Sequence, residues 1–358
     1  YKDGEPGSPV VFLETLIQLS NEINIERAVD GKAPLEIGCR LILNDAKPSV
    51  IALLKENLAP LLAAAKEEAP HLVVEVQYLS KKFEAVYPSI RQTLRDGRFK
   101  NVLFNLDQCG DKMVGMETLS DILRTFQTSG EIFLTFMIKS LLAFLQKSNP
   151  NALQVRLRHL GITSDNLAPL DGMLSKNEWL GTAEKIVFDA FQGCAPFVST
   201  FSLNNPEGWQ YWLIHFSNVP RARQVYNDVL HENASHQAHF GRSGLSLNMF
   251  AFDPDKIGRM YMFEAGDREV AINELAEDIP RLVEDFGDAM LVGDFYNSAY
   301  NLTPSHSEDI KSGMFLNPDL EVLTPTGNVR RKSHTIEVGD TLRIKRQKSF
   351  HILWKDDE

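Results

Sequence analysis

The sequence predicts an α/β protein of two domains, a parallel sheet with a helical insertion followed by a C-terminal α+β region that resembles a winged helix. Three observations support this. Short apolar runs alternate with helical stretches of about a dozen residues up to residue 137. The segment from about 139 to 193 is helical and poor in strands. In the last third, helices precede a hairpin rich in Arg and Lys. We expect domains at 1–235 and 236–358.

In the first domain, each element follows from local signals. Ser8 and Pro9 predict the start of a helix over 8–29, since Ser is a preferred cap and Pro fits the first turn. Pro48 marks the start of a second helix in the same way. The other expected elements are strands at 37–45, 72–78, 101–107 and 131–137 and helices at 83–94 and 116–127.

The second half is expected to begin with a hairpin. Residues 197–203 and 209–216 flank a turn-rich joint at 204–208, and a helix over 220–232 and a loop over 236–244 follow. The C-terminal region then reads as an irregular stretch at 250–263, helices at 269–286, 292–300 and 305–315, a strand at 320–323 and a turn at 324–328. Arg330, Arg331 and Lys332 come next, so we expect them at the tip of the hairpin.

Composition excludes several classes of protein. The chain has 358 residues, of which 43% are apolar and 24% charged, and this balance excludes disorder, collagen and a disulfide scaffold. Cys39, Cys109 and Cys194 lie far apart, without the spacing of a zinc site. The longest apolar run, 132–145, is interrupted by Lys139, so we expect a soluble, cytoplasmic protein and no membrane partner.

The net charge of −11 argues against a nucleic-acid partner, but the charge is unevenly distributed. Residues 321–355 hold eight Lys and Arg against three Asp and Glu, a net charge of +5 that leaves −16 elsewhere. This tail predicts either a phosphate-contacting hairpin or the solvated face of a small sheet. Its cations are Arg330, Arg331, Lys332, Arg343, Lys345, Arg346 and Lys348.

Polar residues at the ends of expected strands are the candidate ligand-binding groups, because open parallel sheets bind ligands there. Asn44 and Asp45 end one strand, where Asp45 either binds a ribose or only caps the next helix. Asp107, Gln108 and Cys109 end another, as a substrate-binding segment or an ordinary loop. Nothing nearby in sequence activates Cys109 as a nucleophile.

Two further segments carry weaker signals. Residues 3–9, with Asp3, Gly7 and Ser8, form a loop before a helix N-terminus, which suits an anion or serves only as loop and cap. The chain opens without Met, and we expect native sequence upstream of it. His231, His236 and His239 lie within nine residues, where solvated loop histidines are favoured over a metal site.

Taken together, these residues resemble the bacterial three-Cys-motif partner protein family. The likeness covers nearly the whole chain and rests on the order of its motifs rather than on any one of them. They are Tyr1-Lys2-Asp3-Gly4-Glu5-Pro6-Gly7-Ser8-Pro9, Leu106-Asp107-Gln108-Cys109-Gly110, Tyr211-Trp212-Leu213-Ile214-His215-Phe216 and the C-terminal helices with their arginine-bearing hairpin.

The resemblance implies a Rossmann-like class I methyltransferase sheet that binds S-adenosylmethionine and acts on nucleic acid. Asp45 would take the ribose-binding position and Asp107 the active-site position, with Asp3, Gly7, Ser8 and Asn44 near the cofactor. Gln108 replaces a Pro and Cys109 an aromatic residue of the amino-methylating pattern, which removes base stacking there. A three-Cys-motif protein is the implied partner. The alternative is an inactive protein of the same fold that binds nucleic acid or a partner protein.

Overall fold

The computed structural model describes residues 7–107, 114–137, 158–170, 176–204, 210–232, 238–239 and 264–345. The chain divides into two compact units, Tyr1–Phe99 and Lys100–Glu358. The expected domain boundary near residue 235 falls inside the second unit.

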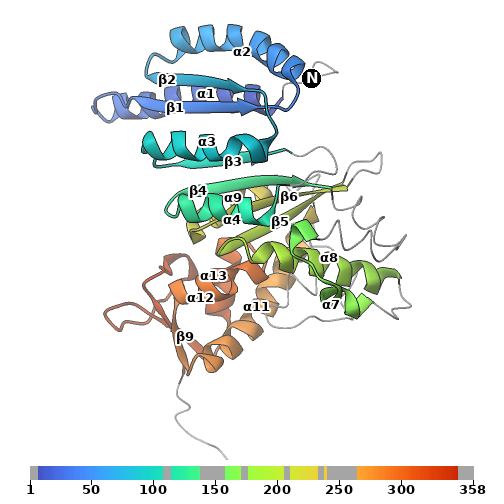
Figure 1. Ribbon diagram of the computed structural model, residues 1–358. Coiled ribbons are helices and arrows are strands. Elements are labelled where there is room, and N and C mark those ends of the chain that lie inside the picture. Colours follow the sequence, from blue (N-terminus) through green and yellow to red (C-terminus); the bar gives the residue numbers. More distant parts are fainter. Residues whose placement is uncertain are drawn as a thin grey trace, which may run out of the picture. The chain divides into compact units, whose positions relative to one another are not determined.

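The first unit combines a two-stranded parallel sheet with three helices (Figure 1). In chain order its elements are α1 (Ser8–Val29), β1 (Ile37–Asn44), α2 (Pro48–Glu68), β2 (Leu72–Leu79) and α3 (Phe83–Asp96). Pro9 and Pro48 lie in the first turns of α1 and α2, as the sequence predicts. The core buries Leu13 of α1 and Leu58 of α2 completely and packs them with Leu72 of β2.

The second unit contains a five-stranded sheet in the order β3-β4-β6-β5-β7. Its strands are β3 (Val102–Leu106), β4 (Gly130–Phe136), β5 (Phe197–Asn204), β6 (Gln210–Ser217) and β7 (Ala238–His239). β3 and β4 run parallel, whereas β6 is antiparallel to both of its neighbours, β4 and β5. The expected parallel sheet is therefore parallel only in part, because the β5–β6 hairpin inserts a reversed strand.

Helices cover both faces of this sheet, with α4 and α9 on opposite faces (Figure 1). Phe136 of β4 contacts Phe191 of α8 on one face with ring centroids 5.2 Å apart, and Phe133 contacts Tyr226 of α9 on the other at 5.5 Å. The helical elements are α4 (Met116–Thr125), η1 (Arg158–Leu160), α7 (Ser164–Leu167), η2 (Ala168–Leu170), α8 (Lys176–Gln192) and α9 (Pro220–Glu232).

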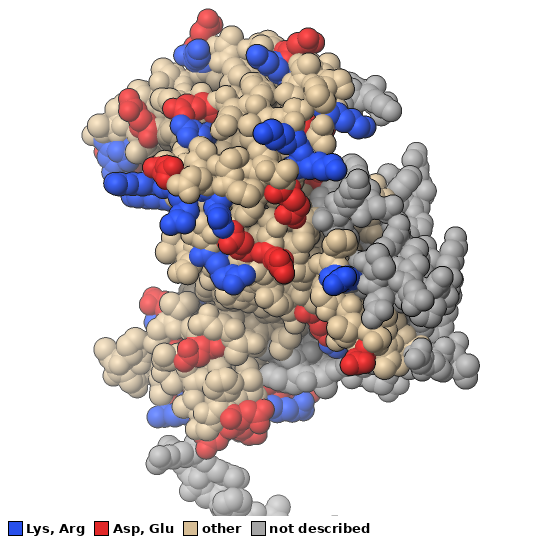
Figure 2. All heavy atoms as spheres, in the orientation of Figure 1, with Lys and Arg blue, Asp and Glu red and all other residues tan. Residues whose placement is uncertain are grey.

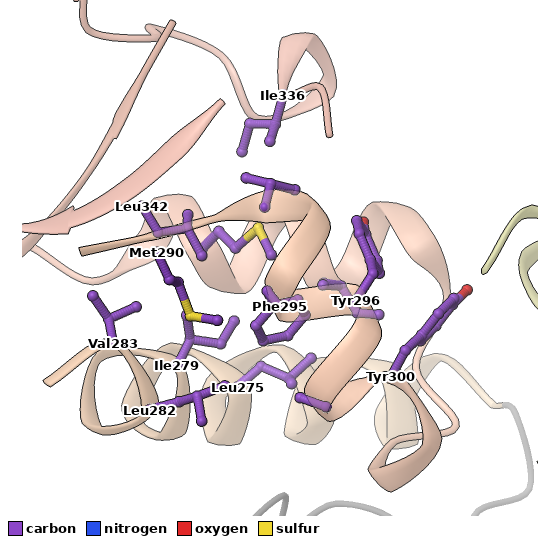
Figure 3. Close-up of a cluster of buried hydrophobic side chains, with 14 of the residues drawn as sticks. Leu275, Ile279, Leu282, Val283, Met290, Phe295, Tyr296, Tyr300, Ile336 and Leu342 are labelled. Carbon is purple, nitrogen blue, oxygen red and sulfur yellow. The ribbon is translucent and has the colours of Figure 1, made fainter. Parts of the chain in front are cut away.

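The C-terminal region of the second unit packs helices against a three-stranded antiparallel sheet in the order β8-β10-β9. Figure 3 shows its core, in which Ile279, Phe295 and Leu342 are fully buried. A Cβ at Gly313 would lie 2.8 Å from Leu275, so this glycine permits the close approach of α11 and α13. The elements are α11 (Ala265–Asp285), β8 (Ala289–Leu291), α12 (Val292–Ala299), η5 (Tyr300–Leu302), α13 (Ser307–Leu316), β9 (Leu320–Leu323), η6 (Ser333–Thr335) and β10 (Thr341–Ile344).

The mixed α/β class predicted from the sequence is confirmed, with helices and several small sheets. Three short strands were not expected. β7 lies within the expected loop at 236–244, and β8 and β10 have three and four residues, too few to show an alternating pattern. Among the described helices, α2 is long and apolar enough to span a membrane by length and composition alone, and a single helix of this kind is weak evidence.

Candidate active-site residues and basic hairpin

Asp107 lies at the carboxyl end of β3 and is exposed, directly after the buried Leu106. The apolar strand therefore ends where the sequence predicts, and it presents a carboxylate at the sheet edge where ligands of α/β proteins bind. Gln108 and Cys109 lie outside the described residues. The substrate-binding role of this segment stays a prediction.

Asn44 and Asp45 lie together at the carboxyl end of β1, where both make local hydrogen bonds. The amide of Asn44 donates to the carbonyl of Lys81 at 2.9 Å and accepts from its N–H at 3.2 Å, which ties β1 to the segment after β2. Asp45 Oδ1 accepts from the N–H of Lys47, the N-cap residue of α2, at 2.7 Å. Asp45 thus bonds the N-cap residue without capping α2, for which no side-chain cap hydrogen bond is present. Its half-buried carboxylate has a second oxygen for a ligand, so the ribose-binding role stays a prediction.

Gly7 is the N-cap residue of α1, with φ −79° and ψ 164°. Its carbonyl accepts the N–H groups of Val10 at 2.9 Å and Val11 at 3.2 Å, and Ser8 is exposed in the first turn. Among the described residues no side chain caps this helix. Asp3 lies outside the described residues. Pro9 has no N–H and those of Val10 and Val11 are bonded to Gly7, so in this first turn only the N–H of Ser8 is left for an anion, and the anion-binding role of the segment stays a prediction.

The hairpin after β9 differs from the expected one, because its tip carries no cation. The turn 324–328 places Gly327 at φ +84°, and a bridge joins Leu323 to Val329 across it. The N–H of Arg330 then donates to the carbonyl of Val322 at 2.8 Å. The expectation of a basic tip was therefore wrong: Arg330, Arg331 and Lys332 follow the turn instead of forming it, because the glycine closes the chain reversal three residues earlier.

Arg330 serves the structure of the hairpin. Its Nε and Nη2 each donate at 2.9 Å to a different carboxylate oxygen of Asp340, a fully buried residue whose Oδ2 also accepts from the N–H of Glu337 at 2.8 Å. Hydrogen bonding to Asp340 raises the pKa of Arg330. A buried carboxylate needs such a partner, so this arginine is committed to the fold of the hairpin.

The remaining cations of the tail divide into paired and exposed groups. Arg343 binds Glu321 through Nε at 2.8 Å, and Lys345 donates to the carbonyl of Pro318. Arg331 and Lys332 are exposed, and neither has a carboxylate partner among the described residues. Arg346 and Lys348 lie outside those residues. Figure 2 shows basic and acidic side chains interspersed over the C-terminal elements that face the viewer.

A buried polar contact that the sequence did not reveal joins α9 to the C-terminal region. Arg223 is 1% exposed, and its guanidinium donates to Ser199 Oγ at 3.1 Å and to the carbonyls of Tyr300 at 2.8 Å and Thr303 at 2.9 Å. It also lies over the Tyr300 ring, 4.5 Å from its centroid. Among the described residues no carboxylate pairs with it, and burial lowers the pKa of this arginine.

The same face of α9 continues this contact toward its C-terminus. Asn227 donates to the carbonyls of Pro304 at 3.2 Å and Ser305 at 2.8 Å, and His231 Nε2 donates to Pro304 at 3.0 Å. Burial lowers the pKa of His231 to about 4. The expectation of a solvated loop histidine was therefore wrong for this residue, because it lies in α9 facing a backbone carbonyl. The positions 223, 227 and 231 share one helical face, and that spacing was the available signal.

A second buried histidine lies on β6. His215 is 1% exposed, and its Nε2 donates to Glu131 Oε2 of β4 at 2.9 Å. Burial lowers the pKa of His215, although Glu131 opposes the shift. Both residues belong to the sheet face that α9 partly covers, and Glu131 lines a groove of about 780 Å³ beside that helix.

No group of three or more His, Cys, Asp or Glu side chains in the described part of the chain could hold a metal ion. His236 lies outside this part. Cys39 and Cys194 are free thiols whose pKa values burial raises. In the comparisons with known proteins, no family model, curated protein or solved structure matches the chain.

Proposed function

We propose that the chain is a methyltransferase-like protein that binds S-adenosylmethionine and acts on nucleic acid. The observation that carries this proposal is the strand order β3-β4-β6-β5, in which the antiparallel strand β6 lies beside the parallel pair β3 and β4. The exposed carboxylate of Asp107 directly follows β3, the first strand in this order. The reversed strand near the sheet edge resembles class I methyltransferases. The comparisons with known proteins supply no further support.

The residues at the strand ends suit this chemistry. Asp45 keeps a carboxylate oxygen for a ribose hydroxyl, while Asn44 holds the neighbouring loop. The cofactor supplies an electrophilic methyl group when it is bound. In the second unit, Asp107 would accept a hydrogen bond from the amine of the substrate and hold it in position. Positioning carries most of this reaction, so it requires neither a metal nor a catalytic triad.

Calorimetry with S-adenosylmethionine tests the cofactor assignment. We expect the chain to bind it and Asp45→Ala to weaken binding by about tenfold, since a charged hydrogen bond contributes about 1.5 kcal/mol. Asp30→Ala is the control, because Asp30 is an exposed acid in the same unit whose carboxylate pairs with Lys32. Absence of binding at millimolar cofactor would overturn the proposal, and unchanged binding by Asp45→Ala would remove the ribose assignment.

The C-terminal region supports a nucleic-acid partner. Its helices and strands follow the order α11-β8-α12-α13-β9-β10 with the sheet order β8-β10-β9, and this order resembles that of a winged helix. We infer that the wing, rather than α13, contacts phosphates. Asp309 of α13 is buried and forms a two-pronged pair with Arg268 at 2.6 and 2.7 Å, whereas Arg331 and Lys332 are exposed.

A salt series of duplex binding tests this inference. The double substitution Arg331→Ala and Lys332→Ala should lower the slope of log K against log salt by roughly two, about 0.9 for each phosphate contact. Arg343→Ala is the matched control, because its guanidinium is paired with Glu321. Equal slopes for the double variant and the wild type would assign the two cations to a solvated surface.

A second candidate function is that of an inactive interaction protein with the same fold. The observation that favours it is the exposed apolar surface beside α9, where Val225 and Leu103 are about half exposed. Under this hypothesis the chain binds its partners without transferring a methyl group. Transfer of radiolabelled methyl groups to nucleic acid, lost in Asp107→Ala, would exclude it.

A further inference from the structure

The helix α13 begins with a histidine cap. Nδ1 of His306 accepts a hydrogen bond from the N–H of Glu308 at 3.1 Å, which satisfies one of the N–H groups that a first turn leaves without a helical partner. The N-cap residues of α1, α2, α3, α4, α11 and α12 make no such side-chain bond. Ser, Thr and Asn caps accept this bond at any pH, whereas an imidazole nitrogen accepts it only while it carries no proton.

The contacts of the His306 ring determine where its proton lies. A neutral imidazole has one N–H, and Nδ1 is the acceptor of the cap, so the proton lies on Nε2. Nε2 is 3.2 Å from Oδ1 of Asp228 on α9, and the same oxygen accepts from Ser307 Oγ at 3.4 Å. Both nitrogens of the neutral ring therefore have a partner, one in the backbone of α13 and one on α9.

A second proton on His306 would meet charges of both signs. Asp228 favours the imidazolium, because its carboxylate lies beside Nε2. The positive end of the α13 dipole and a proton on His231 oppose it, since the rings of His231 and His306 are 5.2 Å apart. The other charged or titratable groups near this joint are Arg221 on α9, Arg268 on α11, Tyr296 on α12 and Glu308, Asp309 and Lys311 on α13.

We propose that His306 is a proton-operated cap of α13. The second proton enters at Nδ1, the nitrogen that holds the lone pair, and turns the acceptor of the Glu308 N–H into a donor that faces it. The ring then keeps only its ion pair with Asp228, and the first turn of α13 is left without a cap. The His306 side chain is 22% exposed, so solvent can deliver this proton, and histidine is the side chain that changes charge between pH 5 and 8.

The cap lies where α9 holds the C-terminal region. Asn227 bonds to the carbonyl of Ser305 and His231 to that of Pro304, the two residues before the cap. Ser307, the residue after the cap, is 3% exposed. Loss of the cap therefore loosens the first turn of α13 at this joint, and acid weakens the hold of α9 on the C-terminal region. None of these residues belongs to the strand-end site, so the inference does not depend on the proposed function.

Hydrogen exchange of the full chain tests the proposal. His306→Asn supplies a cap that does not titrate, and His306→Ala removes the cap at every pH. At pH 7.5 the amides of residues 307–311 should be as protected in the wild type as in His306→Asn, and about fivefold less protected in His306→Ala. At pH 5.5 the wild type should fall to the level of His306→Ala, while His306→Asn keeps its advantage. Comparison of variants at one pH removes the effect of acid on the rest of the chain.

Two further measurements support the comparison. His334→Asn is the matched control, because His334 is an exposed histidine of the same unit, and its amides 307–311 should follow the wild type at both pH values. Nitrogen NMR of histidine-labelled protein reads the tautomer, with His306→Asn identifying the signal, and should show Nε2–H at pH 7.5. Circular dichroism verifies that every variant is folded.

Three results would overturn the proposal. The first is an Nδ1–H tautomer of His306 at pH 7.5, which is incompatible with the cap. The second is a wild type whose first turn at pH 5.5 is still as protected as that of His306→Asn. The third is equal protection of the wild type and His306→Ala at pH 7.5, which would show that the hydrogen bond to Glu308 does not hold the first turn.

Discussion

The two sides of α9 contrast in a way that is unusual for a surface helix, because polar side chains are buried while two valines are half exposed. One side buries Arg223 and Asn227, which are at most 1% exposed, whereas the other exposes Val225 and Val229 at 47%. Amphipathic helices normally bury the apolar stripe and solvate the polar one. Tyr226 and Leu230 are buried as well, so polar contacts to the C-terminal region hold α9 in place together with apolar packing.

The largest effect should follow from breaking the polar side. Arg223→Met removes the donors of three hydrogen bonds and leaves buried carbonyls without partners, so we expect the second unit to lose about 3 kcal/mol of unfolding free energy. Urea unfolding followed by tryptophan fluorescence measures this, because all four tryptophans lie in the second unit.

Two related variants refine this result. Arg223→Lys keeps the charge but not the planar fork, so it should recover less than half of the loss. Arg221→Met, on the exposed side of the same helix, should change stability by less than about 0.5 kcal/mol. Equal losses of unfolding free energy in Arg221→Met and Arg223→Met would contradict a stabilising role of the buried Arg223.

An intermediate effect should appear as the pH falls. The pKa of His231 is about 4 in the folded chain, below its ordinary value of 6.5, so the unfolded chain takes up the proton first. Its contribution to stability is therefore complete above about pH 6.5 and is lost as the pH falls toward 4, by about 2 kcal/mol after allowance for partial exposure.

Urea titrations at pH 7 and pH 4.5 check this sign. His231→Asn should lose less stability than the wild type over this interval, whereas His334→Asn, at an exposed position, should behave like the wild type. His306, Arg268 and Asp309 also act on His231 and stay unchanged in both variants. A His231→Asn variant as sensitive to pH as the wild type would exclude His231 as the source.

The smallest effect should come from the apolar side. Val225→Asp places a charge at a half-exposed position, so we expect the unfolding free energy to change by less than about 0.5 kcal/mol. The same urea assay measures it, with Leu230→Asp as the comparison, because Leu230 is 4% exposed on the buried side and should destabilise strongly. A large loss in Val225→Asp would show that these valines serve the core.

The sequence predicts the elements of the fold well where local signals determine them. The apolar run before Asp107, the prolines that open α1 and α2, and the paired strands β5 and β6 all lie where expected. Contacts distant in sequence could not be predicted. The sequence indicates an unpaired cation at Arg330, whereas in the fold this residue pairs with Asp340. The burial of Arg223 likewise depends on carbonyls about 80 residues away in the chain.

The orientation of α9 shows the same limit. Hydropathy alone predicts that Val225 and Val229 face inward. The backbone carbonyls of the segment before α13 instead accept hydrogen bonds from Arg223 and Asn227, which stabilises the burial of these two side chains. Periodicity identifies a helix, but the partner of each face is decided by tertiary structure.

The contact between α9 and the C-terminal region has a consequence for how the chain can diverge. Its five hydrogen bonds from Arg223, Asn227 and His231 to residues 300–305 all end on main-chain carbonyls. A carbonyl is supplied by every amino acid, so the side chains of the accepting segment can vary while the joint persists. The donors on α9 cannot vary in this way. We expect homologues to keep the polar stripe of this helix and to vary more in the segment that it holds, except at Tyr300, whose ring Arg223 covers.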